Sequence, residues 1–112
     1  MLVYRIENDD EIGPYTSGYA YIPEYAPGIH PAPSQDGIGM IGDHEYCGFE
    51  SLEKAREWFG YPGVVQALAG FSLVVREVAD DLVRAGRKQV VFPLRESVLV
   101  NTHSLDILLE VM

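Results

Sequence analysis

The segment from residue 13 to residue 42 limits what this chain can fold into. It contains six glycines, five prolines and four tyrosines, and it follows neither a helical nor a strand period. Proline removes a backbone hydrogen-bond donor and glycine leaves the backbone free, so regular structure is interrupted repeatedly. We therefore predict one long loop. Loops beyond about 15 residues are uncommon in compact domains unless they are functional or disordered, and tyrosine rings favour packing or binding over disorder.

Length and composition predict a single domain that spans residues 1–112. At 112 residues and 47% apolar content, the chain can bury enough surface to fold without a metal or a disulfide. Cys47 is the only cysteine, so an intramolecular disulfide is excluded. No apolar run approaches the roughly 20 residues of a membrane span, and the first residues lack a signal-peptide pattern. We expect a cytoplasmic protein.

Regular elements are predicted on both sides of the loop. Alternating apolar residues predict a strand at residues 2–7, followed by a charged turn at 8–11. Ser51 can begin a helix that ends at Gly60, and a second short helix is predicted around residues 64–68. Further strands are predicted at 71–78, 89–92 and 97–100, with a polar turn at 85–88, whereas 104–112 fits either a short helix or an edge strand.

These elements predict an α+β fold. We expect a small mixed or antiparallel sheet, two or three short helices, and a long acidic loop rich in Tyr, Pro and Gly at residues 8–45.

The negative charge is concentrated in the first half of the chain. Residues 1–53 carry ten acidic residues and one basic residue, Arg5, whereas residues 54–112 carry seven of each sign. The net charge of −9 therefore belongs to the first half. An acidic, tyrosine-rich surface is typical of binding to a basic partner, and it opposes direct binding to nucleic acid or an anionic membrane. The alternative is that the acids only provide solubility.

Metal binding and cysteine catalysis are not predicted. Only His44 and Cys47 have a spacing typical of metal ligands, and a structural zinc site needs four nitrogen or sulfur ligands. A small buried thiol is a simpler interpretation of Cys47 than a nucleophile.

Four stretches, in this order, resemble the ADP-ribosyltransferase superfamily: VYRIE, GFESLEKAREWF, GFSLVVREV and KQVVF. The resemblance implies that Arg5 holds NAD, that Ser51 supports the nicotinamide pocket, and that Gln89 occupies the position of the catalytic glutamate. Gln89 departs from the family, because an amide can hydrogen-bond but carries no charge to stabilise a developing cation. The resemblance thus implies an NAD-binding protein and argues against transferase activity.

VYRIE, CGFESLEKAREWF and QVVF also resemble small proteins of bacteriophages and prophages, which frequently counter host defence. Together with the acidic half, this resemblance implies an inhibitor of the anti-CRISPR type in the host cytoplasm. Its carboxylates would replace nucleic-acid phosphates on the basic surface of a host nucleic-acid-binding complex, such as a CRISPR effector.

We therefore predict an inhibitor that needs no cofactor, with an NAD-binding protein as the alternative. The predicted electrostatic contacts and tyrosine anchors are Asp9, Asp10, Glu11, Asp36, Asp43 and Glu45, and Tyr15, Tyr19, Tyr21 and Tyr25.

Overall fold

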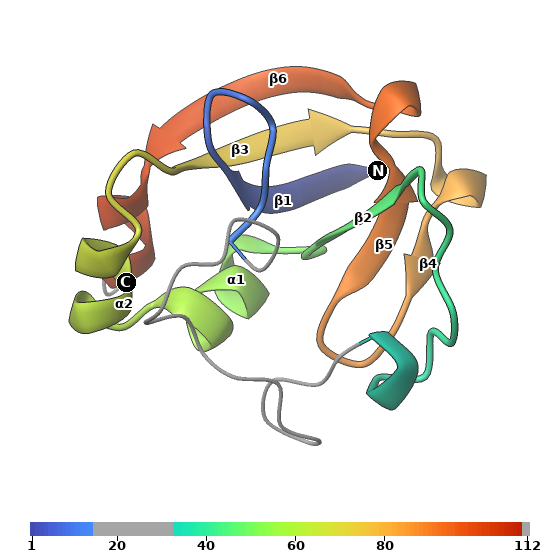
Figure 1. Cartoon of the computed structure of the whole chain (residues 1–112), viewed down its shortest axis with the longest axis horizontal. Coiled ribbons are helices and arrows are strands. Elements are labelled where there is room, and N and C mark those ends of the chain that lie inside the picture. Colours follow the sequence, from blue (N-terminus) through green and yellow to red (C-terminus); the bar gives the residue numbers. More distant parts are fainter. Residues whose placement is uncertain (15–32, 111–112) are drawn as a thin grey trace.

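The computed structural model of the chain describes residues 1–14 and 33–110 (Figure 1). The strands are β1 (Leu2–Glu7), β2 (Glu45–Gly48), β3 (Ser72–Glu77), β4 (Arg84–Ala85), β5 (Val90–Pro93) and β6 (Val98–Ser104). The helices are α1 (Leu52–Phe59) and α2 (Pro62–Ala67), with 3-10 helices at Pro33–Gln35, Asp80–Leu82, Leu94–Glu96 and Leu105–Leu109. The predicted α+β fold class is confirmed.

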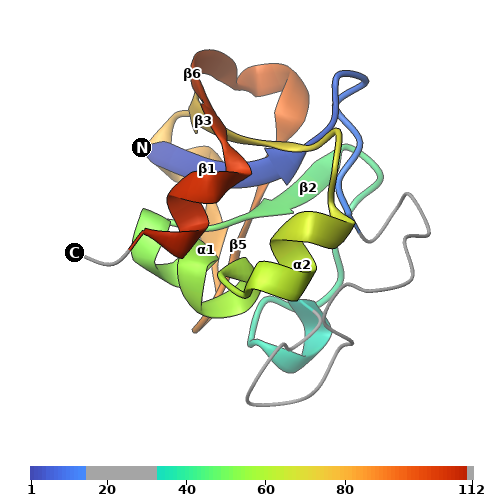
Figure 2. The same cartoon turned by 90° about the vertical axis from the view of Figure 1, so that its left-hand side faces the viewer.

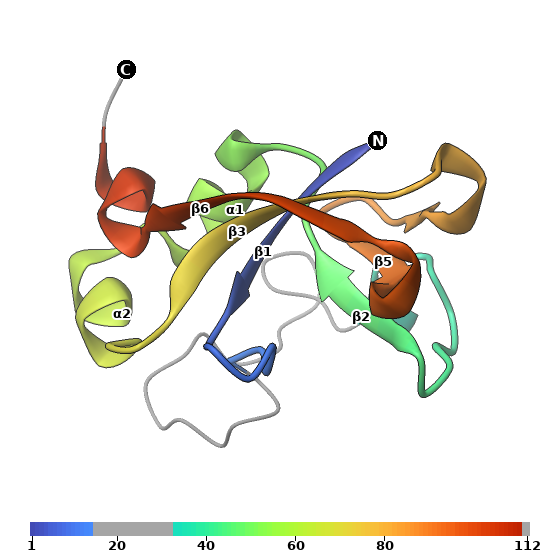
Figure 3. The same ribbon diagram turned by 90° about the horizontal axis from the view of Figure 1, so that it is seen from above.

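The strands form two antiparallel sheets, in the orders β1-β3-β6 and β2-β5-β4. The sheets meet where Tyr4 of β1 faces Phe49, and both backbone N–H groups of this pair donate across a distance of 2.7 Å. Gly48 makes this approach possible, because a Cβ there would lie 2.5 Å from Cγ1 of Val3. Figure 3 shows β3 and β6 as long curved strands that extend from α2 at one end of the molecule to β5 at the other.

Two hydrophobic clusters hold the elements together. The larger cluster joins one face of β1 and β3 to α1 and to the helix Leu105–Leu109, and Figure 2 shows α1 and α2 on one side of that sheet. Its buried members are Ile6, Phe49, Ala55, Trp58, Phe59, Leu68, Phe71, Leu73, Leu105 and Leu108. The smaller cluster contains Val3, Val78, Val90 and Phe92, which come from both sheets and from the residue after β3.

The helix α1 begins and ends where its sequence predicts. The Ser51 hydroxyl accepts a hydrogen bond from the backbone N–H of Lys54 at 3.1 Å, which satisfies one free donor of the first turn. At the other end, the Gly60 N–H donates to the carbonyl of Arg56 at 2.7 Å. Pro62 is the first residue of α2, where its missing N–H costs no helical hydrogen bond.

Several predicted boundaries are wrong. Glu45, the last residue of the loop predicted at 8–45, begins the strand β2, which the sequence did not predict. Arg84–Ala85 forms β4, so the predicted turn at 85–88 begins inside a strand. The strand β6 continues to Ser104, which is four residues beyond its predicted end at 100. Residues Leu105–Leu109 then form a 3-10 helix, since the Ser104 hydroxyl accepts from the Asp106 N–H and Leu105 and Leu108 are buried.

Candidate functional site

Two neighbouring pockets lie on the side of the molecule where the turn after β1 meets β2. The first, here called the apolar pocket, has a volume of about 240 Å³, and the second, the acidic pocket, about 440 Å³. Gly13 and Tyr46 line both. The remaining lining residues of the apolar pocket are Arg5, Ile6, Pro14, Ile41, Glu45, Cys47, Gly48, Phe49, Trp58, Phe59 and Gln89. Those of the acidic pocket are Asp10, Glu11, Ile12, Asp43, His44, Leu94 and Arg95.

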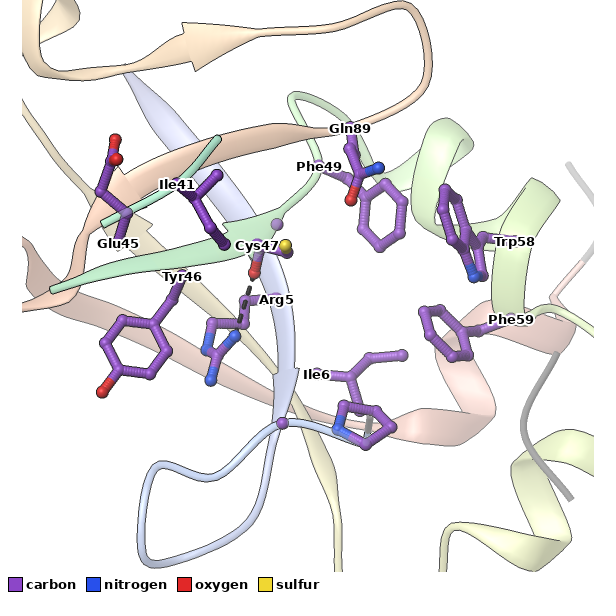
Figure 4. A pocket seen from close by; sticks show the side chains of 13 residues that line it. Arg5, Ile6, Ile41, Glu45, Tyr46, Cys47, Phe49, Trp58, Phe59 and Gln89 are labelled. Carbon is purple, nitrogen blue, oxygen red and sulfur yellow. Dashed lines mark hydrogen bonds between the residues drawn. The ribbon is translucent and has the colours of Figure 1, made fainter. Parts of the chain in front are cut away.

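Three aromatic rings form one wall of the apolar pocket, as Figure 4 shows. Phe49 follows β2, and Trp58 and Phe59 end α1, so the junction of these two elements brings them together. The Phe49 ring centroid lies 5.5 Å from that of Trp58 and 6.0 Å from that of Phe59, both in edge-to-face geometry. The wall is therefore apolar, and its three rings are buried and packed against each other.

Arg5 lies on the opposite side of the apolar pocket and ties three segments together (Figure 4). Its Nε donates to Glu7 at 2.9 Å, its Nη1 to the Cys47 carbonyl at 3.0 Å, and its Nη2 to the Glu11 carbonyl at 3.1 Å. Its guanidinium carbon also lies 5.1 Å from the centroid of the Tyr46 ring. Arg5 thus holds the turn after β1 and the strand β2 in place.

A buried ion-pair network continues from Arg5 to β3. The Glu7 carboxylate also accepts from Nη2 of Arg76 at 2.6 Å, and the same nitrogen donates to the Glu11 carboxylate at 2.9 Å. Arg5, Glu7 and Arg76 are each about 5% exposed or less. Glu11 has a φ of 63°, which is a left-handed conformation that is uncommon for a residue with a side chain. Glu11 therefore holds the turn on the sheet as well as lining the acidic pocket.

Asp10 and Asp43 give the acidic pocket its available charge. Both residues are exposed, and neither carboxylate has a hydrogen bond or ion pair with another residue in the described ranges. Arg95 is the cationic side chain among the residues that line this pocket, beside His44. The two available carboxylates outnumber this guanidinium, so the pocket favours a cation over an anion.

Two of the predicted partner contacts are used inside the protein instead. Asp36 is 3% exposed, and its carboxylate accepts from the backbone N–H groups of Lys88 and Gln89, both at 3.0 Å. Glu45 accepts from Arg84 at 2.7 and 3.0 Å. The hydrogen bond from Arg84, followed by that from the Gly42 N–H, lowers the pKa of Glu45 to about 2.

The other predicted contacts lie elsewhere. Asp9 is exposed but lines neither pocket. Tyr15, Tyr19, Tyr21 and Tyr25 fall outside the described residues.

Of the three residues that the ADP-ribosyltransferase resemblance selects, the structure brings two together. Arg5 of β1 and Gln89, which precedes β5, both line the apolar pocket. Ser51 does not line it, and its hydroxyl caps α1. Burial raises the pKa of the Cys47 thiol in the same pocket, so little reactive thiolate is present near neutral pH.

Within residues 1–14 and 33–110, no group of three or more His, Cys, Asp or Glu side chains is placed to hold a metal ion. No helix in these ranges is long and apolar enough to cross a membrane.

The sequence did not predict Gly13, Ile41 or Tyr46 as site residues. Gly13 and Tyr46 form the wall between the two pockets, and Ile41 lies at the rim of the apolar pocket. The stretch EYCGF contains a signal for Tyr46, since Tyr46 and the glycine at 48 fall on one side of an alternating strand and Cys47 and Phe49 on the other. Four strand residues next to a glycine-rich segment are too short a pattern to stand out.

The fold and the pockets define a small α+β protein with an apolar pocket beside an acidic one. A family model described as bacteriophage T4 Y00F protein matches residues 1–106, so the chain belongs to this bacteriophage protein family. The predicted resemblance to phage proteins is thereby confirmed. Searches of curated proteins and of solved structures found no match to the chain.

Proposed function

We propose that this phage protein is an acidic binding protein that inhibits a host nucleic-acid-binding complex, in the manner of an anti-CRISPR protein. Its carboxylates would occupy places that nucleic-acid phosphates normally take on a basic host surface. The observation that supports this best is the acidic pocket, where Asp10 and Glu11 of one turn meet Asp43 from a separate segment.

The distribution of charge supports the same proposal. The one basic residue of the acidic half, Arg5, is buried in the ion-pair network and does not offset the charge of exposed acids. Asp9, Asp10 and Asp43 remain exposed. Exposed charges of one sign accelerate association with a partner of opposite sign, and 0.1 M salt largely screens this attraction beyond about 10 Å.

The experiment is a competition assay at low and high salt. Host nucleic-acid-binding complexes, CRISPR effectors among them, are incubated with their labelled nucleic acid and with increasing amounts of the protein. We expect displacement of the nucleic acid from one complex, weakened by salt. The variant D10N/D43N should displace it more slowly, whereas the control E57Q/E77Q, which removes the same charge at exposed residues outside both pockets, should retain most of the effect.

Two results would contradict the proposal. If E57Q/E77Q slowed displacement of the nucleic acid as much as D10N/D43N does, the total charge and not the acidic pocket would be responsible for displacement. Absence of displacement from every complex tested would remove the inhibitor function itself.

NAD binding is the second candidate, because Arg5 and Gln89 line one pocket with three aromatic rings. The geometry favours it less. All three nitrogens of the Arg5 guanidinium already donate within the protein, and the Ser51 hydroxyl caps a helix. The test is calorimetric titration with NAD, for the parent and for Q89A. Saturable binding that Q89A weakens would support this candidate, and the absence of heat at millimolar NAD would exclude it.

A further inference from the structure

We propose that the two pockets bind one extended segment of a partner protein, in which a lysine or arginine lies two positions from a large aliphatic residue. The basic side chain enters the acidic pocket and the aliphatic side chain enters the apolar pocket. This inference rests on the proposed function and deepens it, because it states which chemistry on the partner is recognised.

The arrangement of the pockets determines how far apart the basic and the aliphatic side chain lie in the partner segment. Gly13 and Tyr46 line both pockets, so the two cavities are adjacent and share a wall. In an extended segment, side chains two residues apart point to the same side and are separated by roughly 7 Å. Two such side chains can therefore enter adjacent cavities on either side of a shared wall.

The apolar pocket is open to an aliphatic side chain. Ile41 and Tyr46 at its rim are 38% and 36% exposed, and Phe49, Trp58 and Phe59 behind them are buried. Figure 4 shows Ile41 and Tyr46 on one side of the pocket and the three rings on the other. Exposed apolar residues around a concave site are typical of protein interaction surfaces.

Charge complementarity selects a basic residue for the second pocket. Asp10 and Asp43 are exposed carboxylates without a described ion pair, and Glu11 adds a third that is shared with Arg76. Arg95 at the same pocket would repel a cation, but it is one charge against the two carboxylates of Asp10 and Asp43, which are unpaired within the described residues. A lysine or arginine side chain is long enough to place its charge among the carboxylates while its apolar stem contacts the Tyr46 wall.

The wall and the rim are held in place before a partner binds. The guanidinium of Arg5 lies 5.1 Å from the Tyr46 ring centroid, and each of its three nitrogens donates a hydrogen bond within the protein. Near the rim, Arg84 donates to the carbonyl of Ile38 at 3.2 Å and to that of Met40 at 2.9 Å. These bonds support the segment that carries Ile41, so the site loses little conformational entropy on binding.

Peptide binding can be followed by the fluorescence of Trp58. Trp58 is the only tryptophan of the chain and lines the apolar pocket, so its fluorescence reports on that pocket. Four blocked peptides with the same glycine and serine flanks are titrated: Lys-Ser-Leu, Lys-Ser-Ser, Ser-Ser-Leu and Glu-Ser-Leu. We expect Lys-Ser-Leu to bind most tightly. Replacing Leu should weaken binding about tenfold and replacing Lys about fivefold, with Glu-Ser-Leu weakest.

Variants of the protein distinguish the contributions of the two pockets to peptide binding. In D10N/D43N, the preference for Lys over Ser should disappear while the preference for Leu remains. The control E57Q/E77Q should retain both preferences, because these exposed residues line neither pocket. Equal affinity for all four peptides, or no saturable change up to about 1 mM of Lys-Ser-Leu, would overturn the proposal.

Other occupants of the apolar pocket give different results. A fluorescence change with NAD and none with Lys-Ser-Leu would make it a nucleotide site. A change that depends on protein concentration alone would indicate a second copy of this chain. Either result overturns the inference.

The peptide titration and the competition assay can fail independently of each other. Selective peptide binding without displacement of nucleic acid from a host complex would retain the binding site and remove the inhibitor function. Displacement without peptide selectivity would do the reverse.

Discussion

At the scale of single residues, two aspartates of this protein have different roles, one at the surface and one in the interior. Asp43 is exposed at the acidic pocket, whereas Asp36 is 3% exposed and accepts from two backbone N–H groups ahead of β5. Asp36 thereby positions Gln89, which lines the apolar pocket. A buried carboxylate that satisfies backbone donors is costly to replace, because those donors then lose their partner.

We expect Asp36→Asn to destabilise the protein by about 1–3 kcal/mol, since the amide carries no charge and turns one of its ends into a donor facing other donors. Urea unfolding of the two proteins measures this difference. Asp43→Asn is the matched control and should change stability by less than about 0.5 kcal/mol, because Asp43 is exposed. Equal effects of both substitutions would contradict the assigned role of Asp36.

The Glu45–Arg84 pair predicts a dependence of stability on pH. The pKa of Glu45 is lowered from 4.5 to about 2, so the folded state favours the charged form. The contribution of the pair is therefore complete above pH 4.5 and is lost as the pH falls toward 2. The stability difference between the parent and Glu45→Gln should be constant at neutral pH and shrink over this acidic range. A difference that does not change down to pH 2 would show that Arg84 does not hold the carboxylate.

At the scale of elements, the site depends on how β1 meets its two neighbours. On one side, β1 pairs with β3, and the buried network of Arg5, Glu7 and Arg76 spans this pair. On the other side, β1 touches the end of β2 through Tyr4 and Phe49. The two pockets lie beside this second contact, so changes at either junction should affect them.

Gly48→Ala should destabilise the protein by about 1–3 kcal/mol, because an added methyl group overpacks the junction. The new Cβ would lie 2.5 Å from Cγ1 of Val3 and 3.1 Å from the Tyr4 carbonyl oxygen. Thermal unfolding is the measurement. Gly63→Ala in α2 is the control, since a Cβ there meets no atom within 4 Å and should leave stability unchanged or slightly raised. If Gly48→Ala left the melting temperature unchanged, the two sheets could move apart at this junction without a loss of stability.

Glu7→Gln should cost about 3–5 kcal/mol, because it leaves two buried arginines without their shared carboxylate. Glu11→Gln should cost less, since the Glu11 side chain is 57% exposed and water can replace it. Chemical unfolding of both variants tests this order. Because Glu11 contributes to folding, its neutralisation would not be a clean test of binding, which is why D10N/D43N leaves Glu11 unchanged.

At the scale of the whole molecule, the net charge of −9 is the dominant property. Like charges on one surface repel each other, which favours solubility and opposes compaction. The two ion pairs that Glu7 makes with Arg5 and Arg76 are buried and are therefore poorly screened by salt, whereas the carboxylates of Asp10 and Asp43, unpaired in the part of the chain that the structure describes, are exposed.

We therefore expect the melting temperature to rise by about 2–4 °C between low salt and physiological ionic strength, as screening relieves this repulsion. Differential scanning calorimetry at constant pH measures the shift. The variant E57Q/E77Q, with two fewer exposed charges, should show a smaller shift. A melting temperature that falls with salt would mean that attractive surface pairs outweigh the repulsion.

The local sequence is sufficient for the elements whose signals lie within a few residues. The strand β1 follows from apolar alternation, and α1 from the Ser51 cap and the Gly60 end, because such interactions connect neighbours in the chain. The strands β2 and β4 could not be predicted in this way. They have four and two residues, and pairing with β5 rather than their own pattern stabilises them.

The sequence by itself determined the α+β class, the position of α1 and the acidity of the first half. Only the tertiary structure decided which acids face solvent. Asp36 and Asp43 look alike in the chain, but the donors that bury Asp36 are 52 and 53 positions away, whereas nothing described binds the carboxylate of Asp43. Burial and pairing depend on contacts between distant segments, and such contacts leave no local pattern from which a partner could be read.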